Sequence, residues 1–492
     1  MAPPIRVPTY LNPMNAVKAI WRICYILVQY IIIAVYKAPP PKSPQDLRNP
    51  YGRVAVIGAG LTGISSAAHC ISHNFEVVIF EESSRSGLGG IWSHTVVTSV
   101  KKSGGPESKW TINDGAEGAF DAVIVTVGTC GKPKWIDLDG MPKGMAKDSE
   151  TSDADMAKQK DVFKKPIIHS SELDSDKVSE KTIRGKKVVV IGSGASGVEA
   201  VEAALHRGAG EVVMIARTDK WIIPRNIFFD TFLACQPFGR EMPLSFLWES
   251  FLKNWHYYGV KDLTPAHAGL FEGTPVVNDK FLHHVKDGSC KYVRGDPIRL
   301  TSVGVRTNVR DRDTKPGAGG IEKTIDADVI VLATGFERPT ISFLPDSLFP
   351  EDYQRPDLYL QNFTTEDWSV LMTNSSYSSG IGTVGHFHIG IYTRILLTFL
   401  LDENARPTPK DSKLWVDVVR FIKRGASGGP LGFFTYAELT IWLVTFHLLR
   451  PDRLRWLFFI MFGWGVRVKE QKGEGEGAGA VAMERVRKEK VY

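Results

Sequence analysis

The sequence predicts an α/β protein built from two Rossmann-like dinucleotide-binding domains. Two glycine fingerprints support this prediction, GAGLTG at 58–63 and GSGASG at 192–197, and each follows an apolar strand pattern and precedes a helical one. A single G-x-G-x-x-G is weak evidence because glycine-rich turns are common. Two of them in the same strand–turn–helix setting indicate two bound dinucleotides, normally a flavin and a nicotinamide. The expected chemistry is therefore hydride transfer between two cofactors.

Length and composition set the limits of this prediction. The chain has 492 residues, enough for two hydrophobic cores with appendages. Its net charge of +6 is modest, and its basic residues are scattered apart from a tail at 485–490, so no nucleic-acid partner is expected. The five cysteines are far apart and form no C-x-x-C pair. This pattern argues against a disulfide framework, a zinc ribbon and a dithiol reductase of the flavin disulfide type, and it suits reduced thiols facing a cytosol.

The first unit is predicted as a strand at 53–57, a helix at 61–72 and a second strand at 75–80. In such a unit the first glycine makes a tight turn, the second lets the backbone approach a pyrophosphate, and the third lets the helix pack close to the strand. The second strand ends in Glu81, 23 residues past Gly58, near the distance at which an acid reaches a ribose hydroxyl. An acid there repels a 2′-phosphate, so this site suits FAD or NAD. The alternative for Glu81 is a solvated acid at the end of a strand.

The second unit repeats the pattern, with a different residue where the first has its acid. The strand predicted at 211–215 is followed by Ala216, Arg217 and Thr218, and Arg217 lies 25 residues past Gly192. An arginine in this place accommodates a 2′-phosphate, which indicates NADPH. Lys220 is either a second positive charge for that phosphate or an ordinary surface lysine.

Apolar segments near both ends predict terminal membrane-associated helices. Residues 19–36 are apolar on every helical face and close to the roughly 20 residues that span a bilayer. No small-x-small cleavage site follows, so an anchor is favoured over a cleaved signal peptide. The stretch 433–449 suits a membrane segment or a buried core helix equally well. The stretch 456–466 is too short to span, which favours an interfacial or re-entrant segment, and the composition after Lys469 predicts a disordered tail.

Five further segments carry a resemblance to a known family. They are GLGGIW (87–92), FDAVIVTVGTCGKP (120–133), FKKPIIHSSEL (163–173), ADVIVLATGFERP (327–339) and IGTVGHFHIGIYTRILL (381–397). Together with the glycine loops they resemble the flavin-containing monooxygenases, which are related to the Baeyer–Villiger monooxygenases. In the third segment Phe163 and His169 match the family's F-x-G-x-x-x-H linker, whereas Lys165 replaces its glycine.

The resemblance implies that the NADPH domain is inserted within the FAD domain. The implied parts are an N-terminal anchor with a Pro-rich linker (1–45), the FAD-binding domain in two parts (46–175 and 326–410), the NADPH-binding domain (176–325), a C-terminal membrane-associated region (411–468) and a tail (469–492). The implied FAD-binding residues are Gly58, Ala59, Gly60, Gly63, Glu81, Gly90, Trp92 and Gly335. The implied NADP-binding residues are Gly192, Ser193, Gly194, Gly197, Arg217 and Thr218.

The implied function is an FAD- and NADPH-dependent monooxygenase that uses O2 and a flavin C4a-hydroperoxide to oxygenate a small, apolar substrate. The implied location is the endoplasmic reticulum membrane, with the catalytic body facing the cytosol. This chemistry needs no side-chain nucleophile, and no catalytic residue or metal ligand is assigned. His386 and His388, at the start of the closing helix, either face the flavin or are satisfied by backbone groups.

One departure from the family limits the functional expectation. Family members continue after G-G-x-W with a long segment that lines the flavin and carries a supporting Asn, but here Trp92 leads almost directly into a predicted hairpin at 93–112. This reads as an internal deletion. Asn226 and Asn374 match the lost residue by type alone and are assigned no role. Two alternatives therefore stand: a truncated relative that binds FAD and NADPH but acts as an uncoupled NADPH oxidase or is inactive, and a non-catalytic, membrane-tethered binding protein.

Overall fold

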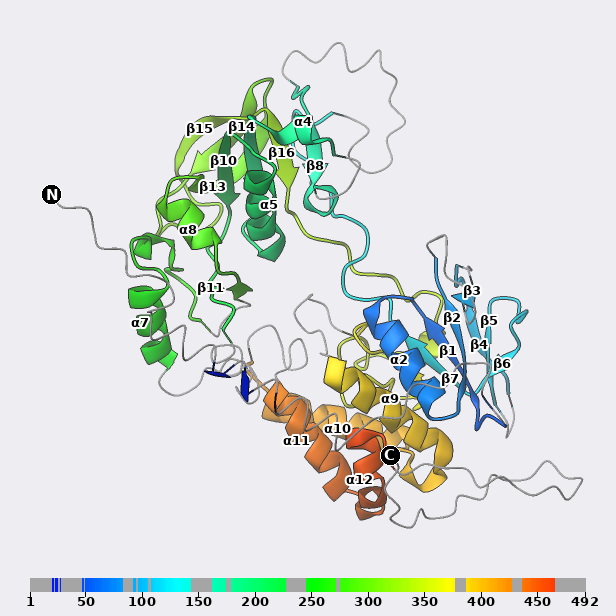
Figure 1. Cartoon of the computed structure of the whole chain (residues 1–492). Helices are drawn as coiled ribbons and strands as arrows, with labels where there is room; N and C mark the ends of the chain where they lie inside the picture. The colour runs from blue at the N-terminus through cyan, green and yellow to red at the C-terminus, as the bar shows by residue number, and fades with distance from the viewer. Residues whose placement is uncertain are drawn as a thin grey trace, which may run out of the picture.

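A computed structural model describes most of the chain as two units joined by two neighbouring segments (Figure 1). The described residues are 20–21, 23–24, 27, 47, 49–82, 92–93, 96–104, 108–142, 162–173, 178–226, 245–270, 275–376, 386–426 and 436–464. The predicted tail at 469–492 and most of the predicted anchor at 19–36 lie outside them.

The first unit is built on a five-stranded parallel sheet in the order β17-β7-β1-β2-β3. Its strands are β1 (Arg53–Ile57), β2 (Glu76–Phe80), β3 (Trp92–Ser93), β7 (Ala122–Val125) and β17 (Val370–Leu371). Side chains alternate along a strand, so Val54 and Val56 of β1 join one core cluster, whereas Ala55 and Ile57 join another. The sheet is therefore apolar on both faces, as its parallel strands require.

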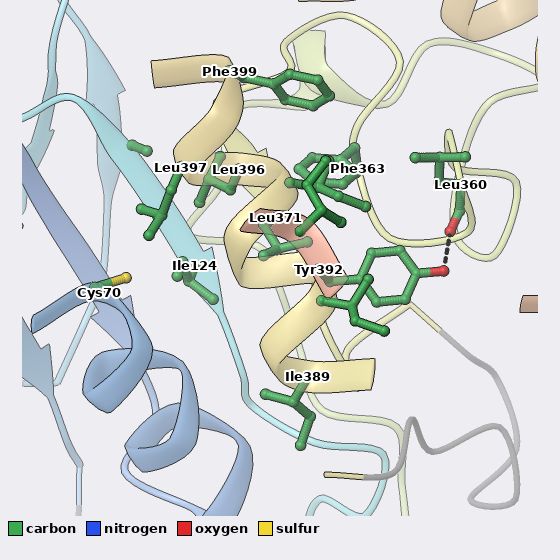
Figure 2. Close-up of a cluster of buried hydrophobic side chains, with 14 of the residues drawn as sticks. Cys70, Ile124, Leu360, Phe363, Leu371, Ile389, Tyr392, Leu396, Leu397 and Phe399 are labelled. Carbon is green, nitrogen blue, oxygen red and sulfur yellow. Dashed lines mark hydrogen bonds between the residues drawn. The ribbon is translucent and has the colours of Figure 1, made fainter. Parts of the chain in front are cut away.

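Different elements cover the two faces of this sheet. The first cluster holds α2 (Leu61–Ser72) and α9 (His386–Leu401), and the second holds an antiparallel sheet of β4 (Val100–Lys102), β5 (Trp110–Ile112) and β6 (Ala119–Phe120). Figure 2 shows side chains of α2, β7 and α9 gathered in the first cluster. There the hydroxyl of Tyr392 donates to the carbonyl of Leu360 at 3.0 Å, so this buried polar group is satisfied.

The second unit is built on a seven-stranded sheet in the order β15-β14-β13-β10-β9-β16-β8. Its strands are β8 (Ile167–His169), β9 (Lys187–Ile191), β10 (Glu211–Ala216), β13 (Cys290–Leu300), β14 (Gly304–Val309), β15 (Ile321–Asp326) and β16 (Val329–Leu332). Four helices of this unit are described, α4 (Glu180–Ile183), α5 (Ala195–His206), α7 (Ser245–Trp255) and α8 (Phe281–Lys286). Strands β8 and β16 lie outside the predicted range 176–325, yet β16 pairs with both β9 and β8. The sheet of the second unit therefore extends past that range at both ends.

The C-terminal helices pack against α9 as part of the first unit. They are α10 (Pro409–Ile422), α11 (Tyr436–Leu448), the 3-10 turn η8 (Pro451–Trp456) and α12 (Leu457–Phe462). Leu439, Trp442 and Phe446 of α11 and Phe459 of α12 are buried in the same cluster as α9. Within the stretch 433–449, α11 is therefore a helix of the core. Within the stretch 456–466, Trp456 and Phe459 are buried, whereas Phe458, Phe462 and Trp464 are exposed, so an interfacial role for this segment stays a prediction. Among the described residues, no helix combines the length and the apolar composition needed to cross a bilayer.

A buried ion pair explains the charge inside the apolar stretch of α11. The ammonium of Lys423, just past α10, lies 3.0 Å from the carboxylate of Glu438, and the two side chains are 1% and 0% exposed. Burial lowers the pKa of Lys423, and the neighbouring Glu438 opposes that shift. A charge buried among apolar groups is tolerated when it is paired, so Glu438 serves the packing of α11 on α10.

Candidate functional site

The first glycine loop has the backbone geometry that only glycine supplies. Gly58 adopts a φ of +103°, and a Cβ there would lie 2.6 Å from the carbonyl oxygen of Thr126. A Cβ on Gly63 would lie 1.9 Å from the carbonyl oxygen of Gly58, so α2 can approach β1 only with glycine at this position. The hydroxyl of Thr126 lies 2.9 Å from the carbonyl oxygens of both Ile57 and Gly58. Thr126 therefore stabilises the first glycine loop, and no local sequence motif predicted this role.

The second glycine of the same loop, Gly60, faces open space. A Cβ built on Gly60 meets no protein atom within 4 Å, although Gly60 is the N-cap of α2. Beside it, the carboxylate of Glu81 accepts a hydrogen bond from the backbone N–H of Ala59 at 2.7 Å. Open space above a glycine turn, a helix N-terminus and a carboxylate at the end of β2 together fit the pyrophosphate and ribose of a dinucleotide.

The second loop repeats this geometry. Gly192 has a φ of +120°, and a Cβ on Gly197 would lie 2.1 Å from the carbonyl oxygen of Gly192. A Cβ on Gly194 meets nothing within 4 Å, so the middle glycine again faces open space. Ser193 donates its hydroxyl to the carbonyl of Thr218 at 2.6 Å, which joins the loop to the segment that follows β10.

Arg217 extends from that segment with its side chain 75% exposed. Its Nε lies 3.7 Å from the carboxylate of Asp296, and the Nε of buried Arg310 lies 2.7 Å from the same carboxylate. Arg310 also donates to the carbonyl of Arg217 at 2.7 Å. Arg217 is therefore accessible and held by neighbours that come from β13 and from the residue after β14. No sequence motif predicts that Asp296 and Arg310 lie beside Arg217, because strand pairing between distant segments brings them there.

The two segments that join the units run side by side at Gly335. The backbone N–H of Lys134 donates to the carbonyl of Gly335 at 2.9 Å, and the N–H of Gly131 donates to the carbonyl of Glu337 at 2.8 Å. The buried His169 contacts the carbonyl of Gly335 through Nε2 at 3.0 Å and accepts at Nδ1 from the N–H of Ser171. Nε2 must then carry the ring proton, and burial lowers the pKa of His169. This histidine of the linker fingerprint ties the two crossings together.

The remaining predicted residues differ in how the structure places them. Gly90 lies outside the described residues, and Trp92 pairs with Ile79 as part of β3. His388 lines a small apolar cavity with residues of α11, and burial lowers its pKa. Asn226 follows β11 (Ile222–Ile223) in the second unit.

Asn374 lies beside the first glycine loop. Its side-chain amide donates to the hydroxyl of Thr62 in the first turn of α2 at 2.8 Å, and its backbone has a φ of +59°. Asn374, which matches the family's Asn by residue type alone, therefore lies near the predicted flavin loop.

The part of the chain that the structure describes contains no cluster of metal-ligating side chains. There, no group of three or more His, Cys, Asp or Glu side chains is arranged to hold an ion.

Comparisons with known proteins agree with this geometry. The family model for an NAD(P)-binding Rossmann-like domain matches residues 56–116, which include the first glycine loop. The rice (Oryza sativa subsp. japonica) indole-3-pyruvate monooxygenase YUCCA1 is 28% identical over 236 residues, covering 46% of this chain and 49% of the rice protein. The human dimethylaniline monooxygenase [N-oxide-forming] 4 is 25% identical over 403 residues, covering 62% of this chain and 65% of the human protein. The chain thus spans about half the length of the rice relative.

Solved structures extend the likeness across both units. The structure of OTEMO in complex with FAD and NADP covers 82% of this chain, with a TM-score of 0.55 and 14% identity, and 99% of the OTEMO chain is matched. The open structure of cyclohexanone monooxygenase covers 82% of this chain and 98% of its own, with a TM-score of 0.53 and 15% identity. At this identity the likeness shows the fold alone. The homologues of this chain are thus flavin-containing monooxygenases, and its fold is that of the Baeyer–Villiger monooxygenases.

Proposed function

We propose that this chain is an FAD- and NADPH-dependent monooxygenase. The main support for this proposal is that the two open glycine loops differ in the charge beside them. The first loop lies beside the carboxylate of Glu81, and the second lies near the exposed guanidinium of Arg217. FAD fits the first loop because its ribose offers hydroxyls to an acid. NADPH fits the second because its 2′-phosphate needs a cation.

In this proposal the residues of the chain bind and orient the two cofactors. The N–H groups at the starts of α2 and α5 receive the phosphates, and Gly60 and Gly194 leave room for them. Bound FAD and NADPH supply hydride transfer and the activation of O2. His169 bonds the carbonyl of Gly335 and so positions the crossing that follows β16. No side chain is assigned a proton-transfer role.

The substrate we propose is a small, apolar organic molecule. The support is the printed activity of the relatives, which act as an indole-3-pyruvate monooxygenase in rice and as a dimethylaniline monooxygenase in humans. We also propose an anchor at residues 19–36 that holds the chain on the endoplasmic reticulum membrane with its catalytic body facing the cytosol. That proposal is supported by the length and apolar composition of the segment.

Arg217→Ala tests the cofactor assignment. A charge-assisted bond to a phosphate contributes about 1.5–3 kcal/mol, so KM for NADPH should rise roughly tenfold to a hundredfold while KM for NADH stays the same. The measurement is the ratio of the two KM values for NADPH oxidation. Arg306→Ala, which removes a surface arginine of the same unit paired with Glu322, is the matched control and should leave the ratio unchanged. An unchanged ratio in Arg217→Ala would remove the basis for the NADPH site.

The short connection after Trp92 favours weak coupling as a second candidate function. Without a segment over the reactive face of the flavin, water reaches that face, and most of the electrons taken from NADPH should be recovered in hydrogen peroxide formed from O2. The measurement is the amount of peroxide and of oxygenated product formed for each NADPH consumed. One product for each NADPH would contradict this expectation, and a purified protein without flavin absorbance would support the non-catalytic alternative.

A further inference from the structure

Two arginines converge on one short loop at the junction of the two units. The Nη2 of Arg338 donates to the carbonyl of Ser376 at 3.0 Å, and the Nη1 of Arg355 donates to the carbonyl of Ser375 at 2.9 Å. Arg355 also donates to the carbonyl of Pro339 at 3.2 Å. Successive carbonyls thus bring two guanidinium groups side by side, from segments that are 17 residues apart in the sequence.

Neither guanidinium has a carboxylate partner among the described residues, in contrast to other arginines of the chain. Arg294, Arg310 and Arg420 each lie within 2.9 Å of an aspartate. Arg338 uses one of its donors and Arg355 uses two, although a guanidinium carries five. Arg338 is exposed and Arg355 is half-buried, yet both guanidinium groups are partly shielded from water. This partial desolvation lowers the pKa of Arg338, and together with the charge of Arg338 it lowers the pKa of Arg355 to about 10. Two like charges held together with donors to spare are complementary to an anion.

The loop that holds this pair lies at the ligand-binding edge of the first sheet. The hydroxyl of Ser375 donates to the carbonyl of Val125 at the carboxyl end of β7 at 2.9 Å. The preceding residue, Asn374, donates to Thr62 in the first turn of α2. Open α/β sheets bind their ligands beyond the carboxyl ends of their strands. The arginine pair therefore adjoins the loop that we propose holds FAD.

We propose that Arg338 and Arg355 form an anion site that binds the carboxylate of the organic substrate. The inference rests on the proposed monooxygenase function and names its substrate class as an apolar molecule bearing a carboxylate. A guanidinium binds a carboxylate through two parallel N–H···O bonds, which fix orientation as well as affinity. Phosphate shares this chemistry, but in the proposed function the phosphates of FAD lie at the N-terminus of α2, where Gly60 leaves open space.

The test compares two probes of nearly equal shape on the full-length, FAD-loaded protein. Phenylacetate carries the negative charge and phenylacetamide does not, and calorimetric titration gives the Kd of each. We expect the wild type to bind phenylacetate at least about tenfold more tightly than the amide, the effect of a charge-assisted bond. Arg355→Gln should abolish this preference by weakening phenylacetate alone, and Arg355→Lys should keep part of it. Arg306→Gln, which removes a surface arginine of the second unit paired with Glu322, is the matched control and should change neither Kd.

Other outcomes would overturn the proposal. Equal affinity for the two probes in the wild type would do so, as would an unchanged preference in Arg355→Gln. Loss of FAD from Arg355→Gln, with inorganic phosphate displacing phenylacetate, would assign the pair to a cofactor phosphate instead. If Arg355→Gln fails to fold, Arg338→Gln gives the same readout, because Arg338 is exposed and makes a single carbonyl bond. Flavin absorbance and the NADPH preference test the proposed function separately, and neither depends on this pair.

Discussion

Gly60→Val is expected to yield a colourless protein that has lost stoichiometric FAD. A Cβ on Gly60 points into open space where the pyrophosphate of a dinucleotide would approach the backbone, so valine would fill the space that the ligand needs. Gly194→Val makes the same change in the second loop and should leave flavin bound while abolishing NADPH binding. The measurements are visible flavin absorbance of the purified protein and a titration with NADPH.

The same geometry provides the controls. Neither Gly60 nor Gly194 has a protein atom within 4 Å of the added Cβ, so both variants should keep the melting temperature of the ligand-free wild type. Gly63→Val should unfold the first unit instead, because its Cβ would lie 1.9 Å from the carbonyl oxygen of Gly58. If Gly60→Val retained stoichiometric FAD, the two loops would have been assigned to the wrong cofactors.

The contact between α2 and α12 should make the first unit sensitive to acid. Arg394 of α9 donates to the carbonyls of Ile460 and Met461 at 2.7 and 3.0 Å, which ties α12 to the core. His69 lies 3.3 Å from Arg394, and the ring of His73 packs edge-on against Phe459 with centroids 4.9 Å apart. Burial, and then the charge of Arg394, lowers the pKa of His69 to about 4 and that of His73 to about 3.

These shifts determine the direction of the pH dependence. Both histidines stay neutral in the folded state, whereas in the unfolded chain they take up protons below their ordinary pKa of 6.5. The free energy of unfolding should therefore be constant above about pH 6.5 and decrease as the pH falls toward the folded-state pKa values. At about 1.4 kcal/mol for each pKa unit, His69 alone accounts for a loss of about 3 kcal/mol. Urea unfolding at a series of pH values measures this loss.

Variants that cannot titrate separate this effect from general acid denaturation. His69→Gln combined with His73→Gln should remove most of the decrease between pH 6.5 and 4. His206→Gln, which replaces an exposed histidine at the end of α5, is the matched control and should leave the profile unchanged. A double variant with the same pH profile as the wild type would show that the histidines do not govern acid stability.

The sequence by itself determined the features that depend on local backbone chemistry. Glycines with positive φ, strands with apolar residues on both faces and helices that begin at a glycine are all encoded within about 30 residues of βαβ chain. For that reason both Rossmann-like units were predictable. The strand-end residues Glu81 and Arg217 were found the same way, by counting from the glycines.

Only the tertiary structure decided what depends on distant partners. An apolar helix such as α11 has the same pattern whether lipid or protein surrounds it, and its burial against α9 became visible only in the fold. Asp296 and Arg310 reach Arg217 through strand pairing, and Arg338 meets Arg355 through carbonyls of a third segment. No periodic pattern in the sequence predicts such contacts, because they depend on how distant segments pack in the fold. The sequence therefore predicted the two loops at which we propose that dinucleotides bind, and the fold decided which charged side chains lie beside those loops.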